Sequence, residues 1–176
     1  MMIVPKHYED LHILHENTLP NRAYYIPASR RLDGLVECRE KSDRLQLLSG
    51  DWSFRWYPSV REVHTPFYQP DDPLEGFSTI PVPSCWQMHG YDQHQYTNIR
   101  YPFPADPPYV PQDNPCGAYV RCFPYRREES APRAFLSFEG VDSCFFLWVN
   151  GQYAGYSQVS HATAEFDVTG FLKEGE

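Results

Sequence analysis

The sequence has no apolar run of the roughly eighteen residues that a membrane-spanning helix needs, and its N-terminus lacks the apolar stretch of a signal peptide. It also has little positive charge: 15 Lys and Arg stand against 23 Asp and Glu, a formal net charge of -8. This balance disfavours nucleic acid and anionic membranes as partners. We therefore expect a soluble protein with a cytoplasmic location.

Cysteines are few and follow no pattern. The sequence contains five, an odd number, and no C-x-x-C pair: Cys38, Cys85, Cys116, Cys122 and Cys144. A disulfide framework normally uses an even number at close, regular spacing. The cysteines are therefore expected to be free thiols, which agrees with a cytosolic protein.

Catalytic and cofactor signatures are missing as well. There is no G-x-S-x-G elbow, phosphate-binding loop, dinucleotide glycine pattern or H-E-x-x-H helix, and no repeat of solenoid length. His7, His12 and His15 lie among acidic residues, but their spacing matches no zinc site and no cysteine accompanies them. Solvated or locally hydrogen-bonded histidines are the favoured interpretation.

Aromatic residues, by contrast, are abundant, at 16% of the chain. The aromatic-rich runs 145–149 and 152–158 are separated by Asn150-Gly151, the strongest short-range signal of a β-hairpin. Alternate residues of 145–149 point to opposite faces of a sheet, and both sets are apolar. This predicts a strand covered on both faces, in the middle of a sandwich and not at an exposed edge.

Further strands are predicted from alternating apolar and polar residues. They cover about 52–57, 77–82, 117–125, 133–139 and 164–168, and Thr169–Leu172 is expected to form a helical turn. Short strands without an amphipathic helix predict an all-β fold, an antiparallel β-sandwich or jelly roll, over residues 46–176. Residues 1–45 lack this alternation and are expected to form an extended N-terminal arm over the domain surface, with one helical turn near 37–44. The sandwich still needs one more strand, so a longer parent chain is expected.

One segment, residues 83–115, is long and irregular. It is rich in proline and aromatic residues, and a structureless segment of this length inside a compact domain is usually functional. Two interpretations stay open at this point. The segment is either an ordered functional loop or a cover for the open end of the sandwich.

Several blocks of sequence resemble one family. Pro83–Asp92, Tyr96–Pro102, Pro108–Tyr119 and Trp148–Gly151 are similar to the sugar-binding N-terminal domain of glycoside hydrolase family 2, and within it to the large bacterial β-galactosidases. The resemblance implies a galactose-binding-domain-like jelly roll that precedes an immunoglobulin-like domain and a TIM barrel. It also implies a parent hydrolase (glycosidase) that cleaves terminal β-D-galactosides with retention. The family's catalytic glutamates belong to the barrel, so no catalytic residue is expected in this chain.

The resemblance also assigns roles to individual residues. Asn98 matches a loop asparagine that reaches into the galactose site, where its amide can orient sugar hydroxyls. Gln158 and Asp10 match ligands of a structural Mg²⁺, although His7 stands where the family offers an acidic ligand. Trp86 could stack on a sugar ring, but core packing is the favoured interpretation.

The expected partners follow from the same resemblance. They are the β-galactoside, bound together with the rest of the enzyme, the other domains of the parent chain, and further copies in a homo-oligomer. Two alternatives stay open: a stand-alone carbohydrate-binding module, and a structural interaction domain without catalysis.

Overall fold

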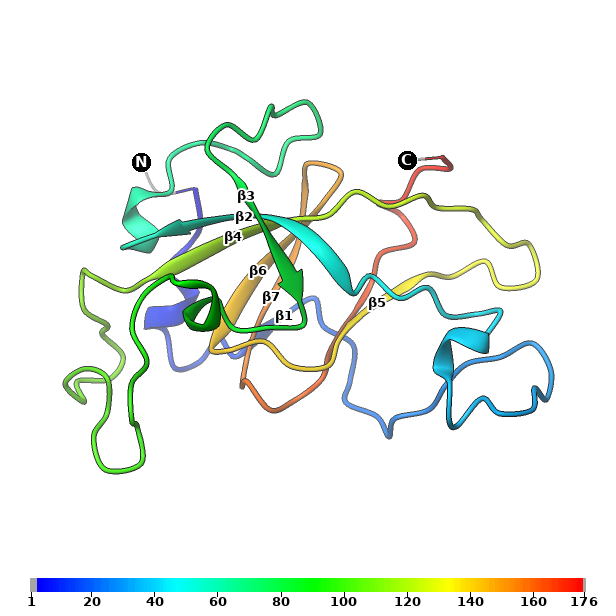
Figure 1. Cartoon of the computed structure of the whole chain (residues 1–176), viewed down its shortest axis with the longest axis horizontal. Coiled ribbons are helices and arrows are strands. Elements are labelled where there is room, and N and C mark those ends of the chain that lie inside the picture. The colour runs from blue at the N-terminus through cyan, green and yellow to red at the C-terminus, as the bar shows by residue number, and fades with distance from the viewer. Residues whose placement is uncertain (1–2, 176) are drawn as a thin grey trace.

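The computed structural model describes residues 3–175 as strands joined by long loops and short 3-10 helices (Figure 1). In chain order the elements are η1 (His7–Glu9), β1 (His15–Glu16), η2 (Arg39–Lys41), β2 (Gly50–Tyr57), η3 (Val60–Glu62), β3 (Ser78–Val82), η4 (Trp86–His89), β4 (Cys116–Val120), β5 (Phe135–Phe138), β6 (Cys144–Val149), β7 (Gln152–Gln158) and β8 (Ala164–Asp167).

The strands form three small antiparallel sheets. Their orders are β1-β7-β6, β3-β2-β4 and β5-β8. The first two sheets cross in the view of Figure 1. The predicted all-β antiparallel sandwich is confirmed. Within residues 3–175 no helix is long and apolar enough to cross a bilayer.

The β6–β7 hairpin forms where the sequence predicts it. Asn150 and Gly151 have φ angles of 50° and 78°, the left-handed values that a two-residue hairpin turn requires. On one face Phe145 packs near Phe166 of β8, and on the other Phe146 packs near His7 of η1, each with ring centroids 5.9 Å apart. Both faces are thus covered, as predicted.

The position of β6 within its sheet differs from the prediction. Among residues 3–175, β6 pairs only with β7, so it is an edge strand. Apolar residues on both faces report that the faces are covered, but they carry no information about hydrogen-bond partners at the edges.

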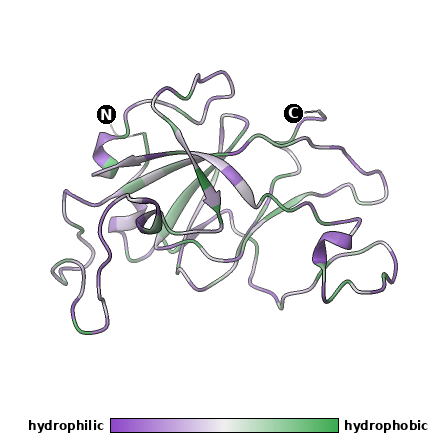
Figure 2. Ribbon diagram, in the orientation of Figure 1, coloured by the Kyte–Doolittle hydropathy of each residue, from purple (hydrophilic) through white to green (hydrophobic). Residues whose placement is uncertain are grey.

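Two apolar clusters form the core. One gathers between β6–β7 and β5–β8 around Phe166, which is 0% exposed, and includes Val149 and Ala154. The other joins Tyr57 of β2 to Ala118 of β4. Hydrophobic residues lie mainly on these central strands, whereas the outer loops are largely hydrophilic (Figure 2).

Part of the expected N-terminal arm is a strand inside the fold. His15 and Glu16 pair with Ser157 and Tyr156 of β7, and Thr18 forms a bridge with Phe166 of β8. Residues 15–18 therefore connect β7 to β8. The sequence did not predict this pairing, whose partners are about 140 residues away in the sequence.

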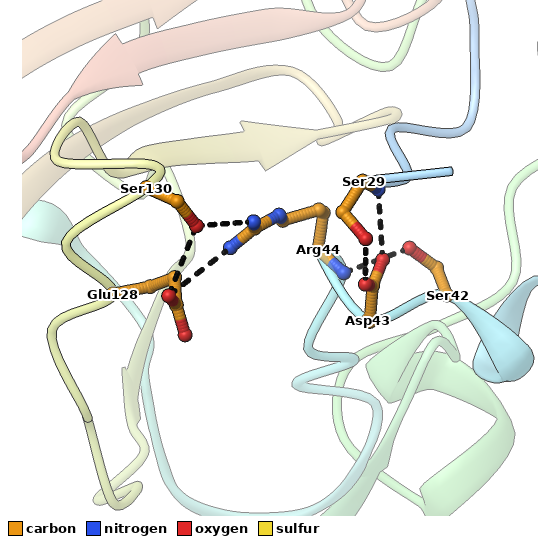
Figure 3. Close-up of polar contacts among 6 residues, drawn as sticks. All are labelled: Ser29, Ser42, Asp43, Arg44, Glu128 and Ser130. Atoms are coloured by element: carbon orange, nitrogen blue, oxygen red, sulfur yellow. Dashed lines mark hydrogen bonds and ion pairs between the residues drawn. The ribbon is translucent and has the colours of Figure 1, made fainter.

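The rest of the arm is held by polar contacts. Arg22 binds Glu165 with two nitrogens, at 3.0 and 2.5 Å. Arg44 donates to Ser130 at 2.6 Å, and beside it Ser29 contacts Asp43 through its amide and its hydroxyl (Figure 3). The helical turn expected near 37–44 is present as η2.

The remaining predicted strands are present with small differences at their ends. β2, β3, β5 and β8 fall within two residues of their predicted bounds, whereas β4 ends at Val120 and not at 125. Pro81 lies in β3, which has a partner on one side only, as expected for a proline in a sheet. The Thr169–Leu172 segment is a hydrogen-bonded turn in which Leu172 donates to Val168.

Candidate functional site

The 83–115 loop begins with a short helix that turns the chain back on itself. η4 ends at Gly90, whose φ is 83°, and Tyr91 N–H donates to Trp86 O at 3.2 Å. A left-handed residue at this position favours glycine because other side chains clash there. The loop is therefore ordered at its start by local sequence.

Two aromatic residues fasten the start of the loop to β2. The Trp86 and Phe54 ring centroids are 6.3 Å apart, and Tyr91 meets Phe54 edge-on at 4.9 Å. The Tyr91 hydroxyl also lies 2.7 Å from Ser78 Oγ. Core packing of Trp86 is confirmed, and this part of the loop covers one face of the sandwich.

The returning end of the loop is held as well. Ser59 Oγ donates to Gln112 O, and Val60 N–H donates to Asn114 O at 3.0 Å. Both contacts lie at the start of η3, where Ser59 is buried. The loop is thus anchored at both ends, and its middle part extends away from the strands at the lower left of Figure 1.

The middle of the loop is exposed and carries Asn98. The Asn98 amide nitrogen donates to Tyr96 Oη at 3.0 Å, and both side chains face solvent. An exposed amide can donate to and accept from hydroxyl groups, but it has no proton to transfer at neutral pH. The arrangement can orient a polar ligand and can do no acid–base chemistry.

Large apolar side chains are exposed along the same loop. Ile99 and Tyr101 are both 81% exposed, and Tyr96 and Tyr109 are also largely exposed. Nearby is an apolar pocket of about 270 Å³, lined by Leu11 and residues 101–110, in which Asp106 is the one charged residue. An apolar patch rimmed by polar groups is typical of an interaction surface.

Gln158 and Asp10, the predicted magnesium ligands, are both engaged by the backbone. Gln158 Nε2 donates to Ile13 O at 2.8 Å, and Asp10 Oδ1 accepts from His12 N–H at 2.9 Å. Residues 3–175 contain no group of three His, Cys, Asp or Glu side chains that could hold a metal ion. Mg²⁺ prefers several oxygen ligands, usually including a carboxylate. The magnesium role of Gln158 and Asp10 stays a prediction.

A polar cluster links β1 to β7. Tyr153 Oη donates to Glu16 Oε2 at 2.6 Å, and His7 Nε2 lies 2.9 Å from the same oxygen. The Tyr153 hydrogen bond, more than the effect of His7, lowers the pKa of Glu16, and burial raises the pKa of Tyr153. His15 Nδ1 lies 3.0 Å from Ser157 Oγ. His7 is therefore locally hydrogen-bonded, as the sequence favoured, whereas the partner of His15 lies 142 residues away in the sequence.

The five cysteines are free thiols, and all of them lie in the described part of the chain. Burial raises the pKa of Cys116 to about 11 and raises that of Cys144 as well. A thiol with a raised pKa is a poor nucleophile at neutral pH. Neither buried cysteine is suited to covalent catalysis.

Comparison with known proteins identifies the family of the domain that carries this loop. Residues 45–176 match the family described as glycosyl hydrolases family 2, sugar binding domain. The chain belongs to this family. The first residue of the match, 45, lies at the predicted boundary between the arm and the domain.

Curated relatives of the chain include bacterial β-galactosidases. The chain is 46% identical to the β-galactosidase of Actinobacillus pleuropneumoniae and 42% identical to that of Staphylococcus xylosus, each over 99% of this chain. It covers only 17% of the length of each relative. The chain therefore corresponds to a small part of those enzymes.

A solved structure supports the fold. The β-glucuronidase of an uncultured Clostridium sp. superposes with a TM-score of 0.53 over 73% of this chain and 20% of its own length. The sequence identity is 22%. This likeness concerns the fold of the family 2 domain alone.

Proposed function

We propose that this chain is the N-terminal sugar-binding domain of a β-galactosidase that hydrolyses terminal β-D-galactosides with retention. The observation that supports the proposal is identity of 42–46% to two β-galactosidases along 99% of the chain. The matched length of 176 residues spans the exposed loop that carries Asn98 as well as the buried strands.

In such an enzyme, this domain and the rest of the chain would have different roles. Retaining hydrolysis needs two carboxyl groups about 5 Å apart, one as nucleophile and one as acid/base. Those groups would come from the rest of the parent chain. This domain would contribute Asn98 at the rim of the galactose site, where the amide holds substrate hydroxyls before bond cleavage.

The structure of the loop favours this role over that of an independent lectin. A sugar site needs several convergent polar groups to pair with hydroxyls. The pocket beside the loop is lined by apolar residues apart from Asp106, and Asn98 stands outside it. The apolar rim fits contact with another protein surface, which a domain of a larger enzyme would supply.

The test is to express the complete parent reading frame and assay it with matched chromogenic β-galactoside and β-glucuronide substrates. We expect turnover of the galactoside and release of β-galactose as the first product, detected by proton NMR. The purified 176-residue chain should show no turnover. Preference for the glucuronide, or activity of the 176-residue chain, would refute the proposal.

Three narrower proposals belong to the same parent enzyme. Free thiols support a cytoplasmic location, and the exposed apolar side chains support a homo-oligomer. The third is a structural Mg²⁺ near Gln158.

If Mg²⁺ binds near Gln158, millimolar Mg²⁺ should raise the unfolding temperature of the wild-type enzyme more than that of the Gln158→Ala variant. Equal shifts would remove Gln158 from the site.

A further inference from the structure

The hydrogen bond between Asn98 and Tyr96 fixes the direction in which the Asn98 amide faces. Asn98 Nδ2 donates to Tyr96 Oη at 3.0 Å. The amide nitrogen is therefore on the Tyr96 side, and the amide oxygen is turned away from Tyr96. Within residues 3–175 this is the one hydrogen bond that either side chain makes. Asn98 Oδ1 is thus left to accept a hydrogen bond from a ligand.

The two residues meet because the chain turns between them. Residues 97–99 form a turn, and the side chains of Tyr96 and Asn98 meet across Thr97. A contact between residues two apart closes a very short loop, so little chain entropy is lost when it forms. The contact therefore depends on the local chain alone and needs no support from the strands.

An exposed asparagine without such a partner would rotate freely. Rotation about its last side-chain bond exchanges the positions of the amide oxygen and the amide nitrogen, so a ligand would meet either group. A ligand that binds a mobile side chain must first restrict it to one conformation, and this ordering lowers the affinity. A hydroxyl that already holds the amide removes part of this cost without touching the ligand.

Tyr96 suits this task because its two ends differ in polarity. The side chain is 73% exposed, on the same loop as the exposed side chains of Ile99 and Tyr101. A tyrosine can bury its apolar ring against another surface while its hydroxyl reaches a polar group. In a complete enzyme, a surface that covers this part of the loop would hold the ring, and the hydroxyl would hold Asn98.

We propose that Tyr96 is a positioning residue for the substrate. Its hydroxyl holds the Asn98 amide with the oxygen outward, so that Asn98 Oδ1 accepts a hydrogen bond from a hydroxyl of the galactoside. The inference rests on the proposed function, because that function places Asn98 at the galactose site. It adds a second residue to the recognition of the sugar and gives a direction to the hydrogen bond between Asn98 and the sugar.

A double-mutant cycle in the full-length enzyme tests the role of Tyr96. The variants are Tyr96→Phe, which removes the hydroxyl and keeps the ring, Asn98→Ala, and the two combined. We expect Tyr96→Phe to raise KM for a chromogenic galactoside about two- to five-fold with unchanged kcat, and to add nothing in the Asn98→Ala background. Tyr25→Phe, at an exposed tyrosine of the arm, is the matched control and should change neither constant.

The Asn98→Asp variant tests the direction of the hydrogen bond to the sugar. A carboxylate keeps the acceptor and has no N–H, and the Tyr96 hydroxyl can donate to it. If Asn98 Oδ1 accepts from the sugar, the KM of Asn98→Asp should lie closer to that of wild type than the KM of Asn98→Ala does. A KM as high as that of Asn98→Ala would show that the amide donates to the sugar, which would overturn the outward orientation of its oxygen.

In an active enzyme, an unchanged KM for Tyr96→Phe, or a rise that adds fully to that of Asn98→Ala, would overturn this inference alone. Crystal structures of the full-length wild type and of Tyr96→Phe give a readout that does not depend on activity. We expect one Asn98 conformation, bonded to Tyr96, in wild type and several in the variant. Equal order of Asn98 in both would overturn the inference. An enzyme that cleaves no β-galactoside refutes the proposed function, and the two crystal structures still decide whether Tyr96 positions Asn98.

Discussion

Gly117 of β4 lies directly against the indole of Trp86, close enough that a Cβ on Gly117 would come within 2.8 Å of Trp86 Cζ3. The same Cβ would meet the rings of Phe54 at 2.8 Å and Tyr119 at 2.9 Å. The absence of a side chain at this residue is what lets the start of the 83–115 loop pack on the sheet.

Gly117→Ala should therefore lower the free energy of unfolding by about 1–3 kcal/mol, the usual cost of overpacking a filled core. Urea unfolding followed by tryptophan fluorescence would measure the change. Gly170→Ala is the matched control, because a Cβ there meets nothing within 4 Å. If both variants are equally stable, the contact between the loop and the sheet is loose and the packing argument fails.

Asp167 at the end of β8 should make stability depend on pH. Hydrogen bonds from Thr169 and then from Arg133 lower the pKa of Asp167 from 3.8 to about 2. A lowered carboxyl pKa stabilises the fold fully above the unfolded value, and this stabilisation is lost as pH falls from 3.8 towards 2.

Asp167→Asn should consequently be less stable than wild type at pH 7, and the two should converge near pH 2. The measurement is the urea midpoint as a function of pH. Asp71→Asn, at an exposed carboxylate, controls for the change in net charge. A constant difference between Asp167→Asn and wild type from pH 7 to 2 would contradict the assignment.

Asn17 should be required for the stability of the 15–18 segment, which connects β7 to β8. Its φ is 60°, and its amide donates to Ala154 O at 3.1 Å. Asn17→Gly keeps the left-handed backbone and loses the hydrogen bond, at a cost of about 0.5–1.5 kcal/mol. Asn17→Ala loses the bond and adds roughly 1–2 kcal/mol of backbone strain.

Thermal and urea unfolding of the two Asn17 variants would test this order. We expect wild type to be the most stable and Asn17→Ala the least. An alanine variant as stable as the glycine variant would show that the backbone at this position relaxes without cost.

Asn98→Ala in the full-length enzyme should weaken substrate binding more than bond cleavage. Loss of one neutral hydrogen bond, about 0.5–1.5 kcal/mol, corresponds to a roughly two- to twelve-fold rise in KM. Stability should hardly change, because the side chain is exposed. Steady-state kinetics on a chromogenic galactoside would measure both constants.

Gln95→Ala, at another exposed side chain of the same loop, is the matched control for Asn98→Ala and should leave both constants unchanged. A large loss of kcat with unchanged KM would instead assign Asn98 to the transition state. If neither constant changes, the loop serves only as a cover for the sandwich.

The sequence alone determined the features that depend on local chemistry. The β6–β7 hairpin follows from Asn150-Gly151, because few residues other than these tolerate the left-handed backbone of its turn. The irregular 83–115 loop follows from its prolines, and the free thiols follow from the number and spacing of the cysteines. Family membership was visible for a similar reason, since blocks such as Pro83–Asp92 are continuous in the chain.

Only the tertiary structure decided how distant segments meet. Residues 15–18 pair with β7 and β8 although nothing in their own sequence alternates, because main-chain hydrogen bonds form between any two extended segments brought side by side. Glu16 and Tyr153, 137 residues apart, likewise meet only through this pairing. The edge position of β6 was hidden for the same reason: side chains report which faces are buried, whereas the edges of a strand are recognised by its backbone.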